Sequence, residues 1–282
     1  MTFVFDIKTG IRQGDSLSPL LFNVLMDRII YNVKNVNHGY RMGNNYIKIV
    51  CYAADAVLIA DSDDGLQWLL QAFKKEAEKI NMEISIPKTK SIVVAREPRR
   101  CKLVVNNEII EQISEFIYLG VKISAHENLL NSLRNQIYRS LRIAGALRTT
   151  IWQNRYMSTQ SKIRIYKTCV RPIMTYAAET RADTAETKRM LRTNEMKVLR
   201  TITGNTLRDQ RRSQDIRNEC EIDDVVRWTR ARRRYWNEHV TRMGAERLAK
   251  IARNGKPATK RPPGRPPKRW KDSWSSASQE RN

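Results

Sequence analysis

The chain has few of the residues that build metal fingers and disulfide scaffolds: 4 cysteines and 3 histidines among 282 residues. The cysteines lie far apart, and none pairs with a histidine at the spacing of a zinc finger. We therefore expect reduced, mostly buried thiols. No apolar run approaches the roughly 20 residues of a membrane span, and residues 1–10 lack the basic start and apolar core of a secretory signal. These absences predict an intracellular protein without a membrane partner.

Acidic residues are scarce in the second half of the chain. Lys and Arg number 52 against 29 Asp and Glu, which gives a net charge of +23. Residues 1–130 hold 16 basic and 15 acidic side chains, whereas residues 131–282 hold 36 and 14. Arginine, which suits bidentate phosphate contacts, outnumbers lysine there by 27 to 9. This asymmetry predicts a nucleic acid, RNA or DNA, as the partner of the second half. A solvated basic surface without a partner is the alternative.

Two apolar runs flank a short break at Ala54-Asp55. The pattern predicts a β-hairpin over residues 47–60 that presents a carboxylate at its tip. A carboxylate fixed on a tight turn between buried strands is a candidate metal ligand. Aspartate is also common at ordinary turns, which is the simpler interpretation of this stretch alone.

Around this hairpin, residues 1–125 predict an α+β fold with an antiparallel sheet and helices on one face. Ser18 and Ser62 are predicted to cap two helices, which end near residues 35 and 80. Expected strands cover residues 2–7, 82–86, 91–94 and 116–123, the last with Gly120 inside it, and Asn106-Asn107 is the expected turn of another hairpin.

From residue 126 to residue 253 the apolar spacing predicts a helical region. Its last helix, residues 223–243, places Trp228, Tyr235 and Trp236 beside a run of arginines. These aromatics either stack on bases or face the core behind a solvated basic side, and the sequence leaves both open. Residues 254–282 are rich in proline and basic residues and predict a disordered, mobile tail. Gly264-Arg265-Pro266 is similar to an AT-hook core, but Pro263 stands where that motif has arginine. We therefore prefer a non-specific basic tail. Such a tail could also act as a nuclear signal.

Four motifs in the same order resemble the palm of the reverse transcriptases of non-long-terminal-repeat retrotransposons. They are the loop and helix start at residues 12–23, Tyr52-Ala53-Ala54-Asp55 where the family has Tyr-Ala-Asp-Asp, Lys88-Thr89, and Tyr118-Leu119-Gly120-Val121.

The resemblance implies an RNA-directed DNA polymerase, a nucleotidyltransferase that uses Mg²⁺. It also implies roles for individual residues. Gln13 and Gly14 would approach the nascent base pair, Lys88 would lie near the triphosphate, and Leu119 and Gly120 would grip the primer end. At the Lys88 motif, Ser85 replaces the family's upstream asparagine.

The metal-binding residues depart from the family pattern. The family holds its ions with an aspartate on an upstream strand and a pair on the hairpin. Here Ala54 replaces the first of the pair and Asp55 remains, while Asp6 lies too close to Gln13 to replace the upstream ligand. One carboxylate is insufficient to hold two hard cations. We therefore expect a truncated reverse-transcriptase segment, a partial palm, that is inactive on its own.

Three alternatives remain. The first is a non-catalytic RNA- or DNA-binding protein that acts through its basic second half. The second is a product without a stable fold, because a missing palm strand would leave a sheet edge open. The third is an active complex in which a partner protein supplies the front half of the polymerase.

Overall fold

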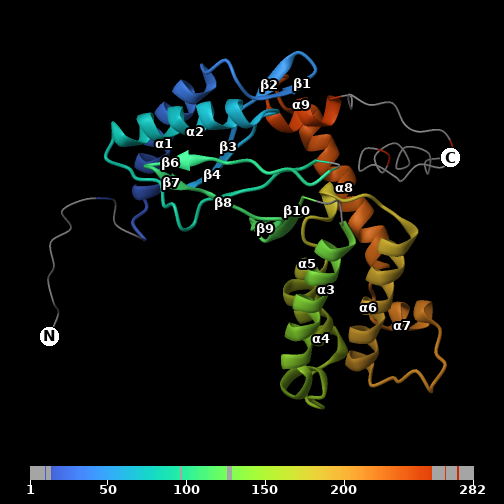
Figure 1. The fold of residues 1–282 in the computed structure, drawn as a ribbon. Helices are drawn as coiled ribbons and strands as arrows, with labels where there is room; N and C mark the ends of the chain where they lie inside the picture. Colours follow the sequence, from blue (N-terminus) through green and yellow to red (C-terminus); the bar gives the residue numbers. More distant parts are fainter. Residues whose placement is uncertain are drawn as a thin grey trace, which may run out of the picture. The chain divides into compact units, whose positions relative to one another are not determined.

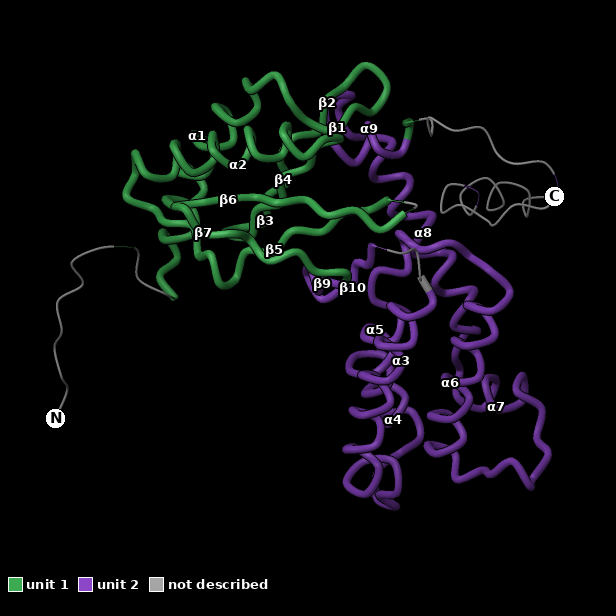
Figure 2. Tube along the Cα trace, viewed as in Figure 1, with its two compact units in different colours: residues 1–114, 254–257 green, residues 115–253, 258–282 purple. Residues whose placement is uncertain are grey.

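The computed structural model describes residue 10, residues 14–95, 97–125 and 129–255, and residues 264 and 272. The predicted strand over residues 2–7 and nearly all of the predicted tail lie outside these residues. The described chain divides into two compact units (Figure 2). Unit 1 ends at Ser114 and also includes Asn254 and Gly255, and unit 2 covers Glu115–Arg253. The mixed α+β class is confirmed, with short strands in the first half and a helical second half (Figure 1).

Two helices, α1 (Ser18–Lys34) and α2 (Asp63–Glu78), pack against each other in unit 1. The cap of α2 is as predicted, because the Ser62 hydroxyl accepts the Gly65 N–H at 3.1 Å. The predicted cap of α1 is wrong. Ser18 lies inside that helix and is buried, the N-cap is Leu17, and the Leu17 N–H donates to the Asp15 carboxylate at 2.9 Å.

The core of unit 1 lies between α1, α2 and the strand that begins at Ile49. Its buried residues are Met26, Ile29, Val33, Ile49, Leu69 and Ala77. Helix α1 carries more apolar side chains than this core covers. Four of these side chains are exposed instead: Leu20, Leu21, Val24 and Leu25.

The strands are short and pair two by two within the described residues. They are β1 (Tyr40–Met42), β2 (Asn45–Ile47), β3 (Ile49–Tyr52), β4 (Asp55–Leu58), β5 (Lys90–Ser91), β6 (Val104–Val105), β7 (Glu108–Ile109), β8 (Glu111–Gln112), β9 (Glu115–Tyr118) and β10 (Val121–Ser124). In place of one antiparallel sheet, these strands form five separate pairs, of which β5–β8 is parallel.

Three strand predictions are corrected. Of residues 91–94, only Ser91 is in a strand, as the second residue of β5. Residues 82–86 form no strand and pair with no strand in the described part of the chain, although Ile84 and Ile86 pack on a small core under α2. Residues 116–123 form the hairpin β9–β10 and not one strand. The predicted turn at Asn106-Asn107 is confirmed, with φ angles of 52° and 64° that suit a two-residue hairpin loop.

Unit 2 is helical after its hairpin, as predicted. Its α-helices are α3 (Leu129–Ala146), α4 (Thr159–Ile165), α5 (Arg171–Met174), α6 (Ala185–Thr203), α7 (Ser213–Glu219), α8 (Val225–Arg242) and α9 (Leu248–Asn254). A π-helical turn, Tyr166–Val170, joins α4 to α5. Pro172 explains this widening, because it has no N–H for a regular bond to Thr168 and its ring crowds that carbonyl.

The core of unit 2 contains a buried ion pair. The Glu195 side chain is fully buried, and its Oε2 accepts from Arg217 Nε at 3.1 Å and Nη2 at 3.0 Å. The same oxygen accepts the Val225 N–H at 3.3 Å, and Tyr166 donates to Oε1 at 3.4 Å. Burial raises the pKa of Glu195 above its ordinary value, and Arg217 opposes that rise. The pair therefore joins α6, α7 and the start of α8.

The prediction of mostly buried thiols is confirmed only in part. Cys101 and Cys220 are buried free thiols, and burial raises the pKa of Cys220 to about 11. Cys51 is half-buried and Cys169 is exposed, so the thiols are less uniformly buried than expected.

Among the described residues, every helix is too short or too polar to cross a bilayer.

Replacing Glu195 by glutamine should destabilise unit 2 by about 3 kcal/mol, because the buried Arg217 would lose its nearest counterion and keep only Asp224, at 3.3 Å. Urea unfolding followed by circular dichroism measures this change. The double variant E195Q/R217M should lose less stability than E195Q, since it removes both charges. As a control, E78Q breaks the exposed Lys74–Glu78 pair and should cost less than about 0.5 kcal/mol. Equal losses in E195Q and E78Q would contradict this account.

Candidate functional site

The β3–β4 hairpin carries the predicted metal ligand. Its register pairs Tyr52 with Asp55, so the loop consists of Ala53 and Ala54. The predicted tip at Ala54-Asp55 is therefore displaced by one residue, and Asp55 is the first residue of β4. The base of the hairpin is anchored by buried Ile49, whereas the side chains of its loop end are exposed. Ala53 has a φ of 49°, a left-handed conformation that costs a residue with a Cβ about 1–2 kcal/mol.

The described residues do not fit a two-magnesium site. Divalent cations of this type need several carboxylate oxygens from more than one segment. No group of three or more His, Cys, Asp or Glu side chains in the described ranges could hold a metal ion. Asp55 is exposed and Ala54 offers no ligand, so this hairpin supplies a single carboxylate.

The predicted nucleotide-binding residues of unit 1 are only partly placed. Gln13 lies outside the described residues. Gly14 is exposed with a φ of 90°, and a Cβ at this position would meet nothing within 4 Å. Lys88 is exposed in a turn whose backbone N–H groups at Lys88 and Thr89 donate to the Ser85 carbonyl at 3.1 and 2.9 Å. No described hydrogen bond or ion pair joins Gly14, Lys88 and Asp55, and their roles remain predictions.

The β9–β10 hairpin presents the predicted primer-grip residues. Its turn is Leu119-Gly120, with φ angles of 47° and 76°. Two side chains of unit 2 hold this turn: Gln136 Nε2 donates to the Gly120 carbonyl and Tyr176 Oη donates to the Leu119 carbonyl, both at 2.8 Å. The sequence analysis missed both contacts, because residues far apart in sequence make them. Their geometry fixes the turn relative to α3.

Most arginines of α8 form ion pairs, hydrogen bonds or cation–π contacts within unit 2. Arg230 and Arg233 lie 3.2 and 3.9 Å from the Asp183 carboxylate, and Arg233 also donates to the Ala178 carbonyl at 2.8 Å. Arg171 and Arg232 lie over the Trp228 ring, 4.5 and 5.5 Å from its centroid. Trp228 is therefore a partner of arginine within the fold, whereas Tyr235 is exposed, so the two interpretations of this helix both stay open.

Comparison with known proteins bears on residues 3–123. This segment matches the family model described as reverse transcriptase (RNA-dependent DNA polymerase). A retrovirus-related Pol polyprotein of the R2 retrotransposable element from Nasonia vitripennis is 33% identical over 123 residues. Residues 3–123 belong to the reverse transcriptases of non-long-terminal-repeat retrotransposons. The family match includes the β3–β4 hairpin and the Lys88 turn, and it ends within β10.

Similarity to mobile-element proteins extends beyond this reverse-transcriptase segment. The RNA-directed DNA polymerase of the mobile element jockey from Drosophila funebris is 28% identical over 213 residues, or 70% of the chain. A transposon-derived protein of Caenorhabditis elegans is 28% identical over 233 residues and is covered for 82% of its length. By contrast, the chain spans 22% of the jockey polymerase and 12% of the R2 polyprotein. Because both of the longer alignments exceed the 121 residues of the family match, this similarity includes part of unit 2.

The adjacent alanines of the hairpin loop offer a matched test of its conformation. Ala53→Gly should raise the free energy of unfolding by about 0.5–1 kcal/mol, because glycine adopts positive φ without strain. Ala54→Gly should lower it by a similar amount, since the φ of Ala54 is negative and glycine there only adds freedom to the unfolded chain. Chemical denaturation of both variants measures the difference. The loop assignment is wrong if the two changes have the same sign.

Proposed function

We propose that this chain is a retrotransposon-derived reverse-transcriptase segment that binds nucleic acid and does not polymerise DNA on its own. Residues 1–125 would form a partial polymerase palm, residues 126–253 the basic helical region after it, and residues 254–282 a basic tail. Gln13, Gly14 and Lys88 would face the nascent pair and nucleotide, and Leu119 and Gly120 the primer end, as in the family.

The proposed inactivity rests on the β3–β4 hairpin, where Ala54 stands in place of a metal-binding aspartate. Reverse transcriptases use Mg²⁺ to activate the primer hydroxyl and stabilise the departing pyrophosphate. In the described residues Asp55 has no acidic neighbours that could complete such a site, and Ala54 lies where the family pattern has aspartate. A lone exposed carboxylate binds divalent cations weakly and leaves them mobile.

Primer extension tests this proposal directly. The purified 282-residue chain should give no templated incorporation on RNA or DNA templates, with either Mg²⁺ or Mn²⁺, because neither ion would be held in a fixed position. An active polymerase in the same buffer serves as the positive control. Extension that follows the template sequence would contradict the proposal, and extension by an inactive preparation heated beforehand would reveal contamination.

Nucleic-acid binding without catalysis is the second candidate function, and the charge of unit 2 favours it. Several arginines on the helices of this unit are exposed and make no ion pair with a described residue, among them Arg139, Arg142 and Arg234. Such cations can displace counterions from a phosphate backbone, which contributes most of the affinity in sequence-independent binding. The two candidate functions are compatible, since a polymerase without its metal ligands can still hold a strand.

The contribution of unit 2 can be measured in the full chain by fluorescence anisotropy with labelled RNA and DNA oligonucleotides. Binding should weaken steeply with salt, and the variant R139Q/R142Q/R234Q should bind roughly tenfold more weakly with a smaller salt slope. The control R28Q/R100Q/K102Q removes three exposed cations from unit 1 and should change affinity far less. A larger loss in this control would assign the binding surface to unit 1.

A further inference from the structure

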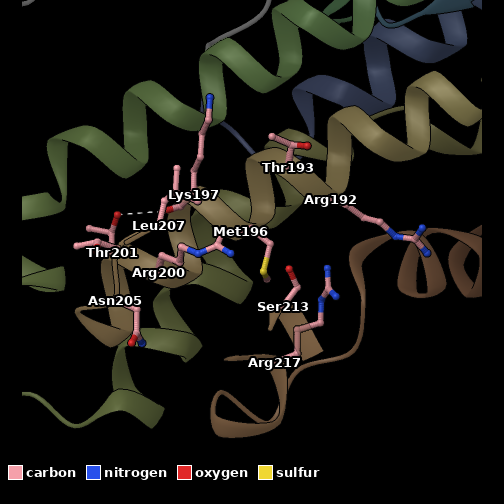
Figure 3. Close-up of a pocket in the computed structure, with 11 residues that line it drawn as sticks. Arg192, Thr193, Met196, Lys197, Arg200, Thr201, Asn205, Leu207, Ser213 and Arg217 are labelled. Carbon is pink, nitrogen blue, oxygen red and sulfur yellow. Dashed lines mark hydrogen bonds between the residues drawn. The ribbon is translucent and has the colours of Figure 1, made fainter. Parts of the chain in front are cut away.

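A pocket of about 580 Å³ lies within unit 2, between α6, α7 and the segment that joins them (Figure 3). Four cationic side chains, four hydroxyl groups and one amide line it, and none of its lining residues is acidic. The lining residues are Arg192, Thr193, Met196, Lys197, Arg200, Thr201, Asn205, Thr206, Leu207, Ser213 and Arg217. None of the motifs of the sequence analysis includes this pocket.

The sequence builds the pocket from helical spacing and one sharp turn. Arg192, Met196 and Arg200 follow each other at intervals of four residues, so they share one face of α6. Gly204 ends the helix with a φ of 70°, which turns the chain back along that face. Asp209 then fixes the joining segment, because its carboxylate accepts from the backbone N–H and hydroxyl of Thr206 at 2.5 and 2.9 Å.

The four cations differ in how far their charge is neutralised. Arg217 is paired with the buried Glu195, and Arg192 is paired with Asp224 at 2.7 Å. Arg200 makes no ion pair with a described residue, and its Nε is buried without a hydrogen-bond partner. A guanidinium without a counter-charge or an acceptor favours an anionic ligand, which supplies both. Lys197 is exposed and also lacks an ion pair among the described residues, but it extends away from the other lining side chains (Figure 3).

The orientation of Arg217 is set before any ligand arrives. Its Nε and one terminal nitrogen, Nη2, are bound to Glu195, which leaves Nη1 without a partner among the described residues. Figure 3 shows the side chains of Arg200 and Arg217 extending toward Met196 from different sides, with Ser213 beside them. A guanidinium group held as that of Arg217 is loses little conformational entropy when it binds an anion, which favours affinity.

We propose that this pocket binds a phosphodiester group of a nucleic-acid strand, with Arg200 as its principal ligand. The inference rests on the proposed nucleic-acid binding of unit 2 and names the place where one phosphate is held. Arginine and neutral hydroxyl or amide donors without a nearby free carboxylate are the usual partners of phosphate oxygens. The volume also exceeds that of a phosphate alone, so the adjoining sugar or base rests on the apolar surface of Met196 and Leu207.

The test compares Arg200→Gln with Arg189→Gln in the full-length chain. Arg189 is on the same helix, is exposed, lacks an ion pair among the described residues and lies outside the pocket. With a short labelled oligonucleotide at fixed salt, R200Q should raise Kd about tenfold, the effect of one charge-assisted hydrogen bond, and R189Q less than about twofold. R200Q should also lower the salt slope by about one phosphate contact. Thermal unfolding of both variants confirms that they remain folded.

The outcomes separate this inference from the function on which it rests. Equal Kd values for R200Q and R189Q, with wild-type binding intact, would overturn the pocket assignment alone. A wild-type chain that binds no oligonucleotide at low salt would overturn the nucleic-acid function and the assignment together. Competition with inorganic phosphate and with a nucleoside monophosphate tests the source of the phosphate. If either one binds in an Arg200-dependent manner while oligonucleotide binding does not depend on Arg200, the pocket is a free-anion site and the strand assignment is wrong.

Discussion

The buried pair of Glu195 and Arg217 is the constraint on which unit 2 depends. A charge in a protein core is tolerable only when a partner and further hydrogen bonds replace its water. Glu195 satisfies this requirement with groups from three other segments: Arg217 of α7, the first N–H of α8 at Val225, and Tyr166. Asp224 extends the network, because it caps α8 and contacts both Arg192 and Arg217. Two acids and two arginines thus fix α6, α7 and α8 relative to one another.

That network also determines which positive charges remain for a ligand. The large positive charge of the second half is not distributed as one uniform surface, since many arginines are already paired within the fold. Arg230 and Arg233 neutralise Asp183, and Arg232 lies near Trp228 and Glu179. Arg200 differs from them because nothing in the described part of the chain accepts from its guanidinium. Net charge therefore overstates the binding surface, and the arginines without partners are the better guide to it.

Local patterns predicted the parts of the fold that depend on local physics. The helices of the second half follow from apolar spacing, the cap at Ser62 from its own side chain, and the turn at Asn106-Asn107 from the tolerance of asparagine for positive φ. Predictions that depended on distant partners were less successful. Strand pairing across residues 82–94 and the burial of the α1 face are set by contacts that the local sequence does not contain.

The same limit applied to the prediction of the site. The hairpin and the identity of Ala54 could be read directly, whereas the contacts of Gln136 and Tyr176 and the α6–α7 pocket required residues brought together by folding.

Catalysis and strand binding depend on different numbers of residues, so the proposed lack of polymerase activity is compatible with the proposed nucleic-acid binding. A metal centre requires a few carboxylates in fixed positions, so that replacing a single ligand, as at Ala54, removes most of its electrostatic effect. Phosphate binding is a sum over many cations, and each substitution removes only a small share of the affinity. The hairpin meanwhile keeps its fold, because Ile49 and the strand register hold it independently of any metal.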